Sequence, residues 1–61
     1  MSDKMSTETA CHIILGDSIA YAIIANQGVH WAVVAAMAAA TKDQDPRALQ
    51  ALRDWVKEKW P

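Results

Sequence analysis

Hydrophobic and polar residues are distributed unevenly along this chain. The 24 residues from Ser18 to Thr41 contain no Asp, Glu, Lys or Arg, and most of them are alanine, isoleucine or valine. A segment this long without charge must be buried in a core, against another subunit or in lipid. The rest of the chain mixes polar and apolar residues. The packing of the uncharged segment therefore governs the fold.

The first part of the chain predicts a helix from about Thr7 to Asn26. Ser6 or Thr7 can cap its start, and Gly28 can end it by taking a left-handed conformation. An apolar stripe at helical spacing supports the helix, formed by Ala10, Ile13, Ile14, Ala20, Tyr21 and Ile24. The pair Gly16-Asp17 interrupts this stripe. It also permits an alternative in which HIIL and SIAYAII are two strands of a β-hairpin, which would make the fold α+β.

The segment from Val29 to about Thr41 predicts a second helix that is apolar on nearly every side. Such a helix is typical of a bundle centre or a subunit interface. Small residues follow one face, so that another backbone can approach closely; they are Ala32, Ala35, Ala36, Ala39 and Ala40. We interpret this alanine face as the interface of a homodimer. The competing interpretation is that alanine is frequent here because it favours helix.

A third helix is predicted after the polar loop TKDQD. Asp45 caps it and Pro46 occupies its first position, where a missing amide hydrogen has no cost. Its inner stripe consists of Leu49, Leu52, Val56 and Trp60, with Ala48 and Trp55 on the flank. Its outer face consists of Arg47, Gln50, Asp54, Lys57 and Glu58.

These elements predict an all-α fold of three helices in one domain over residues 1–61, with residues 1–5 frayed. The first two helices form a hairpin about Asn26 to Gly28, and the third folds across them. A chain of 61 residues buries a small core. Cys11 is the only cysteine, so an intrachain disulfide cannot stabilise the fold. We therefore expect self-association into a dimeric helical bundle to stabilise the small core.

Net charge and composition limit the classes of function that are consistent with this sequence. The formal net charge is −1, whereas nucleic-acid-binding domains normally carry a basic excess. The segment from Ile23 to Met37 nevertheless resembles a helix-turn-helix in spacing, so a small DNA-associated regulator is the first alternative. A membrane-active protein is the second, although Asn26, Gln27 and His30 lie near the middle of the uncharged segment. The N-terminus lacks a basic start and a cleavage site, and we expect a cytoplasmic protein.

Few residues suggest catalysis or metal binding. Cys11 and His12 are neighbours, and adjacent side chains point apart, while His30 has no carboxylate near it in sequence. We therefore expect no catalytic residue, no metal and no cofactor. Asp17 is the only Asp, Glu, Lys or Arg between Glu8 and Lys42. If it is buried it needs a partner, such as His30 or a residue of another chain, and otherwise it marks a turn with Gly16.

Three tryptophans are many for a chain of this size that has no phenylalanine. Tryptophan is enriched at the centres of protein interfaces, and it also fills gaps in alanine-rich cores. We expect Trp55 or Trp60 to be buried, and His30 with Trp31 to lie near an edge. The predicted partner-binding residues are His30, Trp31, Trp55 and Trp60. The predicted function is non-enzymatic binding to a larger protein, as an inhibitor, anti-activator or adaptor of the kind frequent among small phage and bacterial regulators.

Overall fold

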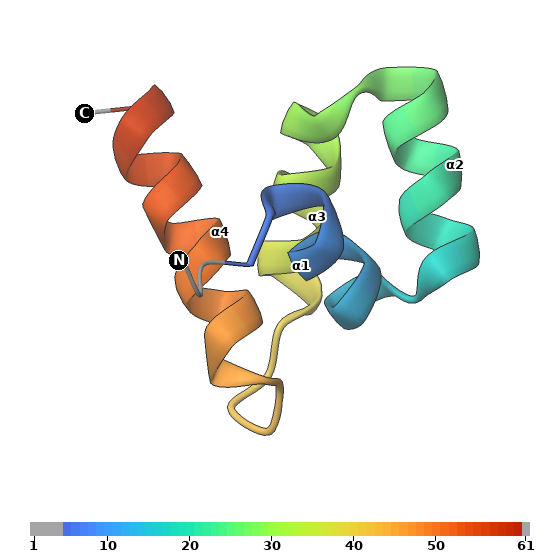
Figure 1. The fold of residues 1–61 in the computed structure, drawn as a ribbon. Coiled ribbons are helices and arrows are strands. Elements are labelled where there is room, and N and C mark those ends of the chain that lie inside the picture. Colours follow the sequence, from blue (N-terminus) through green and yellow to red (C-terminus); the bar gives the residue numbers. More distant parts are fainter. Residues whose placement is uncertain (1–4, 61) are drawn as a thin grey trace.

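The computed structural model describes residues 5–60, and all of its regular structure there is helical. It contains α1 (Thr7–Leu15), α2 (Asp17–Gln27), α3 (Val29–Ala39) and α4 (Pro46–Lys59), arranged as shown in Figure 1. The all-α prediction is confirmed for these residues. The alternative with a β-hairpin at Gly16-Asp17 is wrong, because this segment joins two helices.

The helix predicted from Thr7 to Asn26 is divided in two at Gly16, so residues 5–60 form four helices where the sequence predicts three. Gly16 has φ 91° and ψ 151°, a conformation that is essentially restricted to glycine. Its N–H donates to the carbonyl oxygen of His12 and closes α1, and its carbonyl oxygen accepts from the N–H of Ala20 and begins α2. One glycine therefore ends one helix and starts the next.

Gly28 repeats this arrangement between α2 and α3. It has φ 93° and ψ 167°, and its N–H donates to the carbonyl oxygens of Ile23 and Ile24. The prediction that Gly28 ends the helix before it is therefore confirmed. α3 ends at Ala39, slightly before the predicted Thr41, because Ala40 adopts an extended conformation.

The start of α4 follows the prediction closely. The carboxylate of Asp45 accepts a hydrogen bond of 2.9 Å from the backbone N–H of Arg47, and Pro46 is the first helical residue. The helix ends at Lys59, and the N–H of Trp60 donates to the carbonyl oxygen of Val56 at 2.8 Å. The position of α4 along the sequence is thus fixed at both ends.

The short helix α1 lies at the centre of the fold and contacts each of the other three. α2 packs on α1 and α3 at one side, and α4 packs mainly on α1 at the other side, as Figure 1 shows. The predicted hairpin is therefore formed by α2 and α3 alone, and the last helix packs on α1 more than across that hairpin. Met5 packs against the core, so the predicted fraying does not extend to it; residues 1–4 lie outside the described part of the chain.

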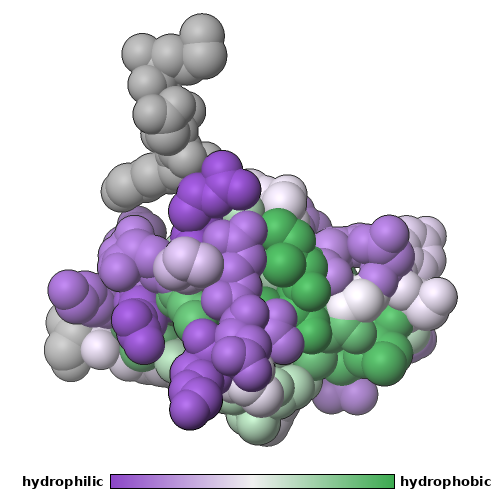
Figure 2. All heavy atoms as spheres, turned by 90° about the horizontal axis from the view of Figure 1, so that it is seen from below, coloured by the Kyte–Doolittle hydropathy of each residue, from purple (hydrophilic) through white to green (hydrophobic). Residues whose placement is uncertain are grey.

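The core is built mainly from small side chains. The buried residues are Ala10, Cys11, Ile14, Ala20, Ala32, Val33, Ala36, Ala48 and Leu52. Alanine allows the short helices to approach closely, but it removes little apolar surface from water. Larger apolar side chains remain exposed, among them Ile19, Tyr21, Trp31 and Met37. In Figure 2, hydrophilic residues cover most of the left half, where α4 lies, and hydrophobic residues reach the surface in the right half.

Within residues 5–60, none of the helices combines the length and the hydrophobicity that crossing a membrane requires.

Candidate partner-binding site

Three tryptophan rings surround His30 at one end of the molecule. The centroid of the His30 ring lies 5.5 Å from that of Trp31, 5.7 Å from that of Trp55 and 4.8 Å from that of Trp60. Trp55 and Trp60 also contact each other, with centroids 5.4 Å apart. All four pairs are edge-to-face, the arrangement that aromatic rings favour. We call these four residues the aromatic cluster.

The directions of α3 and α4 explain why the cluster forms. Gly28 starts α3, which places His30 and Trp31 in its first turn. The Asp45 cap starts α4, and Trp55 and Trp60 then fall near its end. The two helices run in opposite directions, so the start of α3 and the end of α4 lie at the same end of the molecule (Figure 1). Residues 30 positions apart in sequence are thereby brought into contact.

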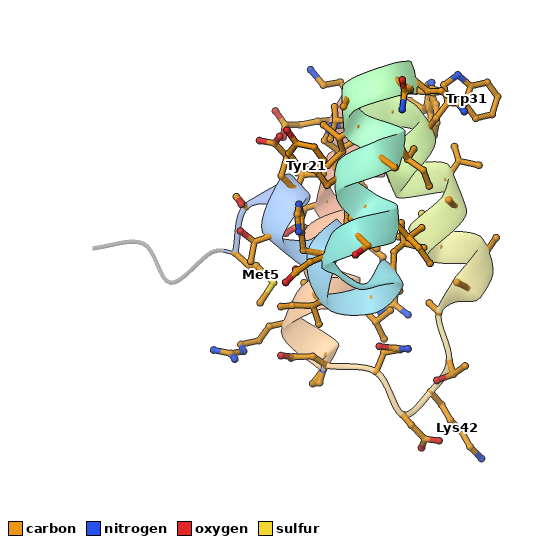
Figure 3. The ribbon with its side chains drawn as sticks, turned by 90° about the vertical axis from the view of Figure 1, so that its right-hand side faces the viewer. Met5, Tyr21, Trp31 and Lys42 are labelled. Atoms are coloured by element: carbon orange, nitrogen blue, oxygen red, sulfur yellow. The ribbon has the colours of Figure 1, made fainter. Side chains whose placement is uncertain are left out.

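The cluster joins the core to the surface. Trp55 is half-buried and packs against the core, whereas Trp31 is 53% exposed and Trp60 is 49% exposed. His30 is also exposed. In Figure 3 the Trp31 ring projects away from the helices at the edge formed by α3. Trp60 contacts the half-buried Trp55, and a ring held in this way loses little freedom when a partner covers it, which is typical of interface anchors.

The structure thus brings together all four residues that the sequence suggested for partner binding. Trp60 differs in one respect, because its predicted place in the inner stripe of the last helix is wrong. The helix ends at Lys59, and Trp60 leaves it with φ −130° and ψ 76°. Its ring therefore rests on His30 at the surface and not in the core.

The alanine face of α3 is used largely within the chain. Ala32 and Ala36 are completely buried, Ala35 and Ala40 are half-buried, and Ala39 is exposed. The backbones that approach Ala32 and Ala36 belong to neighbouring helices of the same chain, since α3 packs on α1 and α2. A second chain could reach only the remaining part of this face.

The opposite side of α3 is exposed and apolar, and of its residues the sequence predicts only Trp31 at the surface. It carries Trp31, Val34, Met37 and Ala38, and we call it the α3 outer face. Val34 is 38% exposed and Met37 is 43% exposed. No Asp, Glu, Lys or Arg occurs between Val29 and Ala39. Helical spacing places these residues on the side of α3 opposite Ala32 and Ala36. Because both sides are apolar, the sequence does not show which of them faces the core.

The candidate catalytic residues are not assembled. Cys11 is completely buried, and burial, followed by the negative charge of Glu8, raises the pKa of its thiol. A raised pKa disfavours the reactive thiolate. His12 points to Asp17 instead, with 3.0 Å between Nδ1 and Oδ1. In residues 5–60, no group of three His, Cys, Asp or Glu side chains is close enough to hold a metal ion.

Asp17 is the first residue of α2, and its side chain is 93% exposed. The suggested pairing of a buried Asp17 with His30 is therefore wrong. His30 belongs to the aromatic cluster, and Asp17 marks the turn at Gly16.

An open groove of about 420 Å³ runs along α4 beside the start of α1. Its lining residues include Met5, Thr7, Arg47, Ala51, Asp54 and Trp55. Its volume falls in the range of small-molecule sites, but its charges are of both signs. Of these residues only Trp55 was expected to contact a partner. The groove therefore adjoins the aromatic cluster through one shared residue, Trp55.

Comparison with known proteins gives no relative: no family model, no curated protein and no solved structure matches this chain.

Proposed function

We propose that this protein is a non-enzymatic interaction module that binds a larger protein through the aromatic cluster, as an inhibitor, anti-activator or adaptor. The observation that carries the proposal is the gathering of Trp31, Trp55 and Trp60 around His30, with two of the rings half exposed. Tryptophan is enriched among the few residues that contribute most of the binding energy of protein interfaces. The proposal includes a homodimer, and it places the protein in the cytoplasm, where an unpaired cysteine such as Cys11 stays reduced.

Two further observations support a binding role over an enzymatic one. Cys11 is inaccessible, and His12 and His30 are each engaged with other side chains. The described surface instead offers apolar groups, including Ile19, Val34 and Met37. Such groups contribute to association by leaving water, and they provide no acid, base or nucleophile.

The DNA-associated alternative receives less support. In a helix-turn-helix the second helix presents its outer face to the major groove, and that helix here is α3. The α3 outer face offers Trp31, Val34 and Met37, which cannot form bidentate hydrogen bonds to bases. We expect no retardation of duplex DNA at low salt. Retardation that disappears as salt rises would favour this alternative.

The test is affinity capture with the full-length chain and matched variants. Trp60→Ala removes an exposed ring of the aromatic cluster. Tyr21→Ala removes a ring that is 71% exposed on α2 and serves as the control. In Figure 3, Tyr21 and Trp31 lie on different sides of the molecule. We expect wild type and Tyr21→Ala to retain the same protein and Trp60→Ala to lose it.

The captured protein is then purified and titrated against the same variants. We expect Trp60→Ala to weaken binding by about 30-fold, corresponding to about 2 kcal/mol, the size of an interface hot spot. Equal affinity of Trp60→Ala and wild type would contradict the proposed site. Capture of no protein by any variant would contradict the proposed function.

A further inference from the structure

The groove along α4 carries opposite charges at its two ends. Its lining residues from this helix are Arg47, Gln50, Ala51, Asp54, Trp55 and Glu58, and we call them the α4 stripe. Steps of three and four residues place them in one row along the helix. Arg47 and Glu58 lie at the ends of this row, about 16 Å apart along the helix axis. A surface that matches the row therefore needs the same two charges in the reverse order.

A second copy of the same helix supplies that order when it runs antiparallel to the first. With a two-fold axis that crosses the helix between Leu52 and Arg53, each residue faces the one that lies equally far from the axis on the other copy. The facing residues are Arg47 with Glu58, Gln50 with Trp55 and Ala51 with Asp54. Every member of the α4 stripe thus faces another member, and opposite charges are paired at both ends. In Figure 1, α4 lies at the left edge of the molecule, with the other helices to its right.

We propose that the α4 stripe pairs with the α4 stripe of a second copy, in an antiparallel arrangement about this axis. The inference rests on the self-association included in the proposed function and assigns it a surface. It takes the place of the alanine face as the dimer interface, because Ala32 and Ala36 are already buried within one chain. Charge complementarity in one register selects a second copy as the occupant of the groove. An unrelated segment would match the groove only if it carried the same charges at the same separation.

The charged groups at both ends are available for pairing. The Arg47 side chain is 76% exposed, and its contact with Asp45, at 3.5 Å, is too long for a strong hydrogen bond. Glu58 is exposed and forms no ion pair with any residue between Met5 and Trp60. A guanidinium group and a carboxylate can form two parallel hydrogen bonds. The two-fold axis creates this pair twice, once at each end of the interface.

The middle of the stripe allows the two helices to approach. Ala51 has a small side chain, and Trp55 offers a half-buried ring beside it. The like charges nearest to the axis are the two Asp54 carboxylates, and each accepts a hydrogen bond of 2.9 Å from Gln50 of its own chain. Antiparallel pairing also places the positive end of each helix dipole near the negative end of the other.

The size of the interface is consistent with a reversible dimer. The α4 stripe extends over about three helical turns, and exposed ion pairs contribute little each. We therefore expect a dimer whose population rises with protein concentration. Because charges hold its register, we also expect the dissociation constant to rise with salt concentration.

The experiment measures molar mass by sedimentation equilibrium over a wide range of concentrations. Wild type should approach twice the chain mass of 6.7 kDa as concentration rises. Arg47→Glu and Glu58→Arg each place like charges at both ends of the interface, and each should raise the dissociation constant at least about tenfold. An equimolar mixture of these two variants should recover the dimer. In the mixed pair the introduced carboxylate faces the introduced guanidinium, and the native Glu58 faces the native Arg47.

Arg53→Glu is the matched control, because Arg53 is exposed on the same helix but lies outside the α4 stripe. It should keep the wild-type dissociation constant. A mixture of Arg53→Glu with Glu58→Arg has the same net charges as the test mixture, but only one of its two charged pairs is attractive. It should therefore recover less dimer than the test mixture. Far-UV circular dichroism of each variant checks that the helices are retained.

Several outcomes would overturn the proposal. Wild type that stays monomeric at every concentration removes the dimer. A dissociation constant that is unchanged in both Arg47→Glu and Glu58→Arg removes this surface. Equal recovery in the test mixture and in the control mixture would show that net charge, and not facing pairs, drives association.

Failure of this inference can be distinguished from failure of the proposed function. Trp55 is shared by the α4 stripe and the aromatic cluster, but the exposed rings of Trp31 and Trp60 lie outside the stripe. Trp60→Ala should therefore lose the larger protein and keep the dimer mass, whereas Arg47→Glu should lose the dimer and keep the larger protein. Loss of capture in Arg47→Glu would assign the groove to the larger protein and overturn the inference. A dimer without any captured protein would contradict the proposed binding of a larger protein only.

Discussion

His12 and Asp17 contact each other across the glycine that separates two helices, with 3.0 Å between Nδ1 and Oδ1. His12 belongs to the last turn of α1, and Asp17 is the first residue of α2. The contact spans Gly16, which allows the chain to turn but does not hold the turn in place. A carboxylate at the start of α2 also interacts favourably with the helix dipole.

Replacing Asp17 with asparagine should therefore have a small effect. The Asp17 side chain is 93% exposed, and exposed pairs of this kind contribute about 0 to 1 kcal/mol. We expect the free energy of unfolding to fall by about 0.5 kcal/mol in low salt, and the difference to vanish in concentrated salt. Chemical denaturation of wild type and Asp17→Asn at low and high salt concentration measures the loss of stability and its dependence on salt. Asp43→Asn, in the exposed loop, is the control, and an equal loss in that variant would show that the contact has no specific role.

Gly28→Ala should destabilise the fold through the backbone alone. Gly28 has φ 93°, and a Cβ added there would have no atom within 4 Å, so there is space for it but no favourable conformation. We expect a loss of about 1 to 3 kcal/mol in the free energy of unfolding. The chain is short enough for chemical synthesis, and D-alanine, which favours positive φ, should cause little loss at the same position. Similar losses for both forms of alanine would contradict a backbone origin.

The sequence allowed the ends of the helices to be predicted where one residue type has one strong local role. Asp45 and Pro46 define the start of α4, and Gly28 ends α2, as expected. Gly16 interrupts the apolar stripe, but the sequence predicts one continuous helix or a β-hairpin there and not two helices. The outcome depends on what packs around it: Ile14 and Ala20, on either side of Gly16, both enter the same core. Local pattern cannot show this, because the core is formed by tertiary contacts.

The sequence predicts which residues belong to the candidate site but not how they are arranged in space. The chemistry of His30 and the tryptophans predicts a role in binding, whereas the contact between His30 and Trp60 depends on the antiparallel course of α3 and α4. The exposed Val34 and Met37 were missed for a related reason. α3 is apolar on every side, so hydrophobicity does not indicate which side faces the core.

The free energy of unfolding should depend on pH because of the carboxyl group of Asp45. The pKa of its carboxyl is lowered, first by the hydrogen bond from the backbone N–H of Arg47. A lowered pKa in the folded state means that the carboxylate stabilises the fold above the ordinary value of about 3.9, and that this contribution is lost as pH falls through the lower, folded value. We expect Asp45→Asn, which keeps a capping oxygen, to show a weaker loss of stability below pH 4. Thermal unfolding between pH 2 and 6 measures the stability of both proteins. Parallel curves of stability against pH for wild type and Asp45→Asn would show that Asp45 does not contribute to the pH dependence.

Ala36→Leu tests the assignment of the alanine face to the chain's own core. Ala36 has no exposed surface, so a leucine there must displace neighbouring side chains or backbone. Overpacking of this kind costs about 1 to 3 kcal/mol. The matched variant Ala39→Leu lies at the exposed end of the same helix and should be nearly neutral. Denaturant unfolding at a concentration where the protein is monomeric compares them, and equal stability of both variants with wild type would show that Ala36 is not tightly enclosed.

His30→Ala tests whether the aromatic cluster is a connected unit. His30 contacts three tryptophan rings, so its removal should release Trp31 and Trp60 from their fixed orientations. Such contacts contribute about 0.5 to 1.5 kcal/mol each when well packed, and because His30 is exposed we expect a total loss of about 1 to 2 kcal/mol. The near-UV circular dichroism of the tryptophans should weaken, and affinity for the captured protein should fall in parallel. His12→Ala is the matched control, because His12 contacts Asp17 and no tryptophan, and should leave the near-UV spectrum unchanged. An unaltered spectrum in His30→Ala would show that the rings are held by α3 and α4 independently, and it would remove the structural basis for treating them as one binding site.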